Sequence, residues 1–126
     1  MYLEKAFSKY HGNFYTIEGG SPHRALEAMT AFPGKWISLG DASKTNEIWN
    51  TLTAAQNRGT IMAAGTQGRE YSNGLVGGHA YALHSLHTLS NGVRLVRLSN
   101  PWGVDVYTGD WSDNSSLWTA TLRAEV

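Results

Sequence analysis

The chain has 126 residues, which is enough for about one domain with a modest core. Basic and acidic side chains are balanced at 10 each, so charge gives no reason to expect a nucleic-acid partner or an acidic membrane surface. No apolar run approaches the roughly 20 residues of a membrane-spanning helix, and the N-terminus lacks the apolar segment of a signal peptide. Cysteine is absent, which excludes disulfides, thiolate metal sites and a cysteine nucleophile within the chain and fits an intracellular, cytoplasmic protein.

The first half of the chain has helical periodicity. Residues 2–10 carry apolar side chains at the i, i+3, i+4, i+7 spacing of an amphipathic helix: Leu3, Ala6, Phe7 and Tyr10. Ser21 as N-cap and Pro22 at the first helical position predict a second helix over residues 22–32, which Pro33 then ends. A third helix is expected over residues 44–58, with Ile48, Leu52 and Ala55 on one face.

The periodicity changes to that of strands after residue 59. Residues 60–66 form an apolar run that predicts a buried strand, and residues 79–89 and 93–100 alternate approximately between apolar and polar. The Asn-Gly pair at positions 91–92 is a hairpin turn signal. Helices come first and paired strands later, so the expected fold class is α+β with an antiparallel sheet.

Two glycines, Gly77 and Gly78, precede His79 at the expected start of a strand and leave its imidazole accessible. A histidine considered alone is more often structural than catalytic, and this interpretation suffices for His84 and His87. A metal site built from the three histidines is disfavoured. On a regular strand His79 and His87 share a face while His84 points the other way, and no cysteine or acidic partner lies nearby in the sequence.

Asn100 closes the next predicted strand and is followed by Pro101, Trp102 and Gly103. A residue before proline is held extended, and the amide oxygen of such an asparagine can accept the Nδ1–H of a nearby imidazole. That bond would fix the imidazole tautomer, as a carboxylate does in a serine triad, and the Trp102 ring can shield it from water. The alternative is that the Asn-Pro pair simply starts a turn.

The spacing of this pair can be tested against hairpin geometry. A two-residue turn would pair Ser90 with Val93 and therefore Leu83 with Asn100. His79 and Asn100 would then share a face, but four strand residues would separate them by about 13 Å, too far for a hydrogen bond. Contact requires a four-residue loop, a β-bulge or strong strand curvature.

Several segments resemble the calpains, papain-like cysteine proteases that are regulated by calcium. GLVGGHAYAL at 74–83 resembles the family's catalytic-histidine segment. VRLVRLSNPWG at 93–103, followed by YTGDWSDNSSLW at 107–118, is similar to the segment that carries the catalytic asparagine. LEKAFSKYHGNFYTIEGG at 3–20 resembles the end of the first protease-core subdomain, and KWISL at 35–39 looks like the junction. The resemblance covers nearly the whole chain, more loosely at the third predicted helix.

The resemblance implies that catalysis is shared between two subdomains that face a cleft. Residues 1–33 would be the tail of the first subdomain, and residues 34–126 the second subdomain, truncated at its C-terminus. His79 would act as the base and acid, and Asn100 would orient it, while the cysteine nucleophile would come from the first subdomain, which is missing here. We therefore expect the chain alone to be inactive. Trp102, Gly77 and Gly78 would border the cleft.

The resemblance also implies a calcium site in the intact protein, formed by an acidic loop after the Asn-Pro-Trp-Gly group. Asp113 matches one family ligand, but Val106 stands where the family has another acidic ligand. Asp105 and Asp110 lie nearby and could compensate, since Ca²⁺ binds several oxygen ligands. The alternative is that these aspartates belong to a solvated loop, and this alternative is favoured for the present chain.

Two classes of function remain open at this point. The first is part of a calpain-type intracellular cysteine endopeptidase that acts on protein or peptide substrates. The second is a calpain-like relative that no longer cleaves and serves as an interaction module. The presence of both His79 and Asn100 favours the first class. An unrelated small β-rich binding domain is a more distant alternative.

Overall fold

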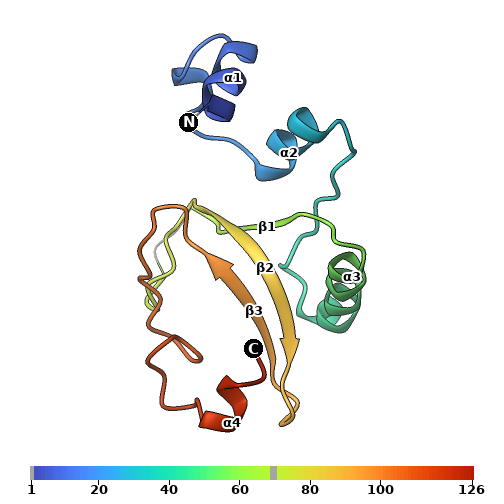
Figure 1. Cartoon of the computed structure of the whole chain (residues 1–126), viewed down its shortest axis with the longest axis vertical. Helices are drawn as coiled ribbons and strands as arrows, with labels where there is room; N and C mark the ends of the chain where they lie inside the picture. The colour runs from blue at the N-terminus through green and yellow to red at the C-terminus, as the bar shows by residue number, and fades with distance from the viewer. Residues whose placement is uncertain (1, 69–70) are drawn as a thin grey trace. The chain divides into compact units, whose positions relative to one another are not determined.

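The computed structural model describes residues 2–68 and 71–126. The chain divides into two compact units, Met1–Trp36 and Ile37–Val126. Figure 1 shows the helices and strands of both units in chain order. No helix within the described residues is long and apolar enough to cross a membrane.

The first unit contains α1 (Tyr2–Tyr10), the short 3₁₀ helix η1 (Tyr15–Ile17) and α2 (Pro22–Thr30). Helix α1 has the predicted bounds. Helix α2 ends two residues earlier than predicted, because Ala31 turns into the left-handed conformation with φ 59° and its N–H bonds to the Glu27 carbonyl at 2.9 Å. A residue before proline avoids the helical region, so Phe32 does not continue the helix.

The second unit holds a three-stranded antiparallel sheet in the order β1-β2-β3, preceded by one long helix. Its elements are η2 (Ala42–Lys44), α3 (Thr45–Asn57), β1 (Met62–Gly65), β2 (Ala80–Thr88), β3 (Arg94–Ser99) and α4 (Ala120–Arg123). Helices precede an antiparallel sheet, so the predicted α+β class is confirmed.

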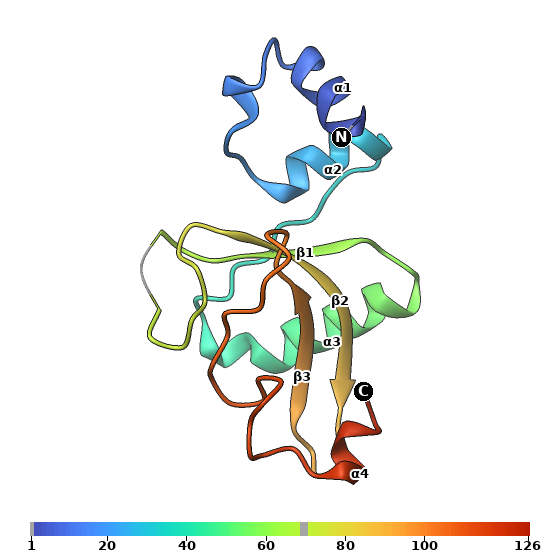
Figure 2. The same cartoon turned by 60° about the vertical axis from the view of Figure 1, so that its left-hand side comes forward.

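The sheet of the second unit is covered differently on its two sides. Helix α3 lies along one face of the sheet, and the chain after β3 runs on the other side, as Figures 1 and 2 show. The most buried apolar side chains come from β2 and the residue that follows it: Tyr81, Leu86 and Leu89. Strand β2 is therefore the central strand of the sheet and contributes most of the core of this unit.

The hairpin between β2 and β3 differs from the predicted two-residue turn. Ser90 does not pair with Val93; the last sheet pair is Thr88 with Arg94, and the Leu89 N–H bonds to the Val93 carbonyl at 2.8 Å. Gly92 takes φ +85°, which favours glycine. The loop therefore has three residues and ends in a left-handed glycine, one of the common hairpin forms.

A β-bulge interrupts the pairing of β2 with β3. Leu83 pairs with Leu98, whereas Ser85 pairs with Arg97, so His84 is an additional residue on β2. A bulge of this kind leaves the additional residue unpaired and bends its strand. It is one of the three arrangements that the sequence allowed for contact between the two strand ends.

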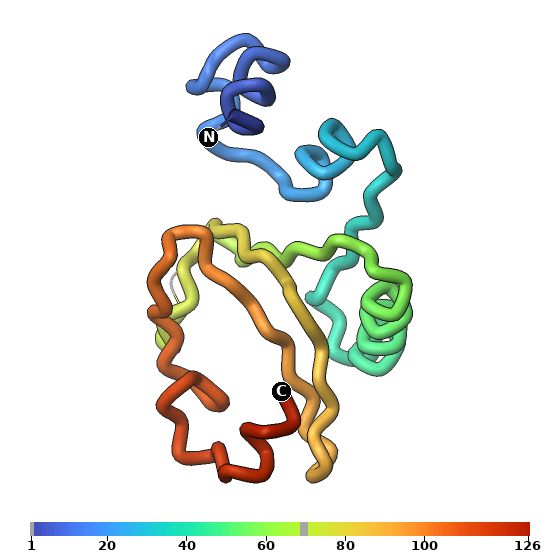
Figure 3. Tube along the Cα trace, viewed as in Figure 1, coloured from blue at the N-terminus to red at the C-terminus, as the bar shows by residue number. Residues whose placement is uncertain are grey.

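The segment after β3 is irregular and returns to the hairpin. Figure 3 traces it from the end of β3 to α4, which lies beside the β2–β3 turn. The Glu125 carboxylate accepts hydrogen bonds from the N–H and the hydroxyl of Ser90, both at 2.7 Å. Within the segment, Trp111 and Trp118 pack edge to face with ring centroids 4.9 Å apart.

Candidate active site

His79 and Asn100 lie in direct contact. His79 immediately precedes β2, and Asn100 immediately follows β3. The His79 Nε2 and the Asn100 Oδ1 are 2.9 Å apart, and both residues are half-buried. The predicted contact is therefore present, while a catalytic role for the pair stays a prediction.

The bond engages a different ring nitrogen from the one expected. The residue pattern predicted a bond between the Asn100 oxygen and Nδ1, but that oxygen lies at Nε2. Nε2 is the ring nitrogen farther from the His79 backbone, so Asn100 contacts the outer edge of the imidazole ring. Nδ1 is then the nitrogen that the Asn100 bond leaves available for proton exchange with another group.

The bulge at His84 explains why the two residues share a face. The pair Leu83–Leu98, extended along the strands, sets Tyr81 opposite Asn100, and His79 lies on the same face as Tyr81. Without the additional residue, Asn100 would face an even-numbered position of β2 and His79 would point to the other side. A one-residue change of register reverses every side chain in this way.

The same bulge separates two of the histidines. His87 pairs with Leu95 and Ala82 pairs with Ser99, and both partners lie on one face of β3. His87 therefore shares the face of Ala82 and not that of His79. The expectation that His79 and His87 share a face is wrong, because it assumed a regular strand. His87 instead contacts the Ser85 hydroxyl at 2.8 Å.

The backbone around His79 is held by the side chain of Thr66, just after β1. The Thr66 Oγ1 accepts the His79 N–H at 2.9 Å and donates to the Val76 carbonyl at 2.6 Å. Gly78 takes φ +61°, and its N–H bonds to the Gln67 carbonyl at 2.7 Å. Gly78 thus adopts the left-handed conformation that the turn before His79 requires and that glycine takes most readily. Glycine is therefore favoured here by its backbone conformation as well as by the steric access it gives to the imidazole.

Trp102 packs on the imidazole. The ring centroids of His79 and Trp102 are 4.4 Å apart with the planes tilted by 48°. The backbone N–H of Trp102 donates to the Asn100 Oδ1 at 3.1 Å. Trp102 nevertheless remains 60 % exposed. The Tyr81 ring packs edge to face with the imidazole, with its centroid 4.9 Å from that of His79.

Asn100 also carries a buried polar atom without a partner among the described residues. Its Nδ2 is out of contact with solvent and makes no hydrogen bond there. Its Oδ1 accepts two, from His79 and from the Trp102 N–H. The amide is therefore held through its oxygen, and that oxygen is the atom that faces the imidazole.

Sequence reasoning missed the role of Gly74. It takes φ +83°, and a Cβ at this position would overlap the Val106 carbonyl. The Thr108 N–H bonds to the Asn73 carbonyl at 2.8 Å beside this approach. The loop before His79 thus packs against the loop after Trp102. The glycine-rich sequence marked the segment, but only the structure shows its partner.

The three candidate calcium ligands lie in one open hollow without converging. Residues 105–110 and 112–116 line this hollow. The Asp105 carboxylate accepts the Tyr107 N–H at 2.9 Å, and the Asp110 and Asp113 carbonyls accept side-chain donors. Across the described ranges, no three histidine or acidic side chains are grouped as metal ligands. These residues, as placed, do not fit a calcium ion, which binds several oxygens at once.

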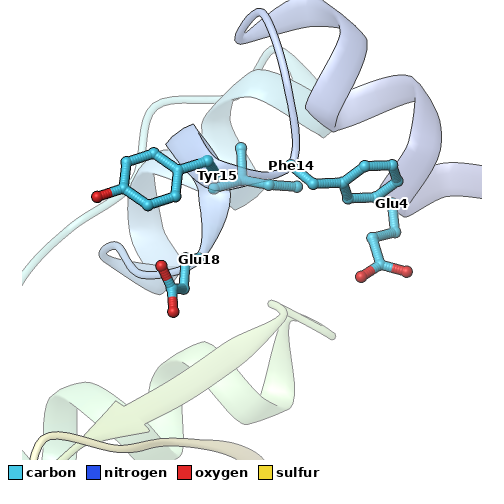
Figure 4. A pocket seen from close by; sticks show the side chains of 5 residues that line it. Glu4, Phe14, Tyr15 and Glu18 are labelled. Atoms are coloured by element: carbon cyan, nitrogen blue, oxygen red, sulfur yellow. The ribbon is translucent and has the colours of Figure 1, made fainter.

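A second hollow belongs to the first unit and contains none of the predicted site residues. Figure 4 shows it between Glu4, Phe14, Tyr15 and Glu18, with Ile17 completing the lining. It is open and combines apolar surface with two carboxylates. The chemistry of the His79–Asn100 pair lies elsewhere, in the second unit.

Comparison with known proteins gives consistent matches. A family model described as calpain family cysteine protease matches residues 1–125. The calpain-type cysteine protease DEK1 of Arabidopsis thaliana is 34% identical over 131 residues, which cover 96% of this chain and 6% of that protein. Calpain-14 of Homo sapiens is 36% identical over 121 residues, which cover 92% of this chain and 17% of that protein. The chain thus spans less than a fifth of the length of these relatives.

Proposed function

Because the chain belongs to the calpain family of cysteine proteases, we propose that it supplies the histidine and asparagine of a cysteine endopeptidase site. The observation that carries this proposal is the 2.9 Å contact between the His79 Nε2 and the Asn100 Oδ1. A histidine held by a hydrogen bond at one ring nitrogen is prepared to exchange a proton at the other. Proteins and peptides are the substrates of this reaction class.

In the proposed mechanism His79 acts at Nδ1. It takes the proton of a cysteine thiol, the thiolate attacks the substrate carbonyl, and the imidazolium then donates the proton to the leaving amine. Asn100 accepts the Nε2–H throughout and keeps the ring in one orientation. The chain has no cysteine, so the nucleophile must come from outside these 126 residues, and the chain alone is expected to be inactive.

We propose that residues 1–33 form the end of one protease subdomain and that residues 34–126 belong to the next. Exposed apolar side chains in the segment after Asn100 support the idea that another part of the protein covers this segment. Trp102 is 60 % exposed and Val104 is 54 % exposed. In this proposal Trp102, Gly77 and Gly78 border the substrate cleft.

Calcium dependence is proposed for the intact protein on the strength of family membership alone. Asp105, Asp110 and Asp113 do not converge as ligands, and the position at Val106 offers only its backbone carbonyl. A family member that binds partners without cleaving them is the second candidate, and the intact His79–Asn100 contact favours cleavage over it.

The proposal is tested in the full-length protein with a fluorogenic peptide. We expect His79→Ala to lower kcat by at least about a thousandfold, because the thiol loses its base. Asn100→Ala should lower kcat less, because His79 keeps its chemistry and loses only its orientation. His87→Ala is the matched control, since His87 lies in β2, which follows His79, and faces the opposite side of the sheet. Unchanged hydrolysis by His79→Ala would refute the proposal.

A further inference from the structure

Gln56, near the C-terminal end of α3, is hydrogen-bonded to both backbone groups of Leu86 in β2. Its Oε1 accepts the Leu86 N–H at 2.6 Å, and its Nε2 donates to the Leu86 carbonyl at 3.3 Å. Two residues that face each other in an antiparallel sheet exchange both bonds in the same way. The Gln56 amide therefore takes the place of a strand residue beside Leu86.

Strand β1 does not reach the position that Gln56 occupies. The pairing of β1 with β2 ends where Met62 meets Leu83, three residues before Leu86. Leu86 is only 6 % exposed, so its backbone groups have little access to water. A buried backbone N–H or carbonyl needs a partner, and the side chain of Gln56 provides it for both groups.

The bulge lies between these two attachments. Pairing with β1 holds β2 up to Leu83, and Gln56 holds it again at Leu86. His84, the additional residue, is enclosed between them. Moving the bulge past Leu83 or Leu86 would change the register of that residue by one and turn its backbone groups away from their partners, so the two attachments keep the bulge between them.

We propose that Gln56 is a positioning residue for the His79–Asn100 pair. By holding Leu86, it keeps the additional residue of β2 at His84 and so keeps His79 on the face of Asn100. The importance of this placement for catalysis rests on the proposed function, whereas the placement itself does not. Without Gln56, β2 can take up the unbulged register, in which His79 points away from Asn100.

The test uses nuclear magnetic resonance on the 126-residue chain. Gln56→Met removes both hydrogen bonds at similar side-chain length, and Asn57→Ala changes an exposed neighbour on the same helix as a control. Two signals are followed: cross-strand contacts of Leu83 with Leu98, and solvent exchange of the His79 Nε2–H. We expect Gln56→Met to weaken the first and to accelerate the second by at least about tenfold, with no change in Asn57→Ala.

Both readouts are independent of catalysis. If His79→Ala left peptidase activity intact but Gln56→Met still changed the register, the proposed function would fail and the positioning role would stand. Retention of both signals in Gln56→Met would overturn the positioning role. If Gln56→Met does not fold, Gln56→Glu carries the same test, because it keeps the acceptor for Leu86 and loses only the donor. Unfolding of both variants would also overturn the role, since Gln56 would then serve the fold as a whole.

Discussion

The orientation of Asn100 is decided by its neighbour in the chain. The Asn100 Oδ1 accepts the backbone N–H of Trp102, two residues later, at 3.1 Å, which is the pattern of an Asx turn. This bond fixes the amide so that its oxygen faces His79. One short segment therefore supplies the acceptor for the imidazole, the bond that orients the acceptor and the ring that packs over the contact.

Trp102→Ala should lower catalytic activity while costing the chain little stability. With 40 % of its surface covered, the ring buries roughly 80 Å², so its removal should cost at most about 2 kcal/mol, below the 3–5 kcal/mol typical of a fully buried tryptophan. In the full-length protein the same change should lower kcat, because the imidazole loses a packing partner. Thermal melts of the chain and peptide hydrolysis by the full-length protein measure the two effects. A chain that unfolds on this substitution would make Trp102 a core residue instead.

The sequence was sufficient to predict this pair of residues but not the atoms that meet. His79 and Asn100 could be chosen because each stands at a strand end beside a characteristic turn. The choice of Nε2 over Nδ1 depends on the approach of two strand ends in space, which residue spacing does not encode. The buried Nδ2 of Asn100 was equally beyond prediction, since burial depends on the tertiary packing around it.

At the scale of elements, two departures from regular pairing combine to make the site. The hairpin loop has three residues instead of two, and the bulge at His84 adds one further residue to β2. Either change alone shifts the register by one residue and would put His79 and Asn100 on opposite faces. The two changes together bring them back to one face, as in a regular two-residue hairpin. The regular hairpin expected from the sequence thus has both residues on the correct face but too far apart. The bulge depends on Gln56 and β1, which no local pattern reveals.

Gly74 should be the glycine whose replacement matters most to the two site loops. Gly74→Ala meets both a positive φ of +83° and the Val106 carbonyl, so the loops before His79 and after Trp102 must separate. The left-handed conformation alone costs about 1–2 kcal/mol, and the displaced backbone adds to this. We expect a lower melting temperature and a changed amide resonance for Thr108, whose N–H bonds to the Asn73 carbonyl.

Gly59→Ala is the matched control for this prediction. Gly59 also has a positive φ, +69°, but a Cβ there would meet nothing within 4 Å. It should show only the conformational cost, with the Thr108 resonance unmoved. Equal effects of the two substitutions on stability and on Thr108 would mean that the approach of Val106 to Gly74 contributes nothing.

At the scale of the whole molecule, the order of helices and strands was predictable because it follows from local periodicity. The helix over 2–10 and the strands either side of the hairpin were all expected within a residue or two. The early end of α2 was not, because Ala31 adopts a left-handed conformation that is unusual for alanine. The return of the chain to the hairpin was also not predicted, since Ser90 and Glu125, which meet there, lie far apart in the sequence.

The contact between Glu125 and Ser90 is expected to depend on pH. Hydrogen bonds from the Ser90 hydroxyl and then from the Ser90 N–H lower the pKa of the Glu125 carboxyl below its usual value. A lowered carboxyl pKa means that the folded chain favours the ionised form. The stability that this contact contributes is therefore fully present above the unfolded-state pKa and is lost as pH falls through the lower, folded-state pKa.

Glu125→Gln should accordingly lower the melting temperature by a small amount near pH 7, and the difference from the unchanged chain should shrink as the pH falls below about 4. The effect is small because the carboxylate is fully exposed and water screens it. Ser90→Ala should reproduce part of the loss, since it removes the hydroxyl donor and keeps the N–H donor. Glu18→Gln, which removes an exposed carboxylate from the other unit, is the control. A difference between Glu125→Gln and the unchanged chain that stays constant from pH 7 to pH 3 would show that the Glu125 charge does not hold the C-terminal segment to the hairpin.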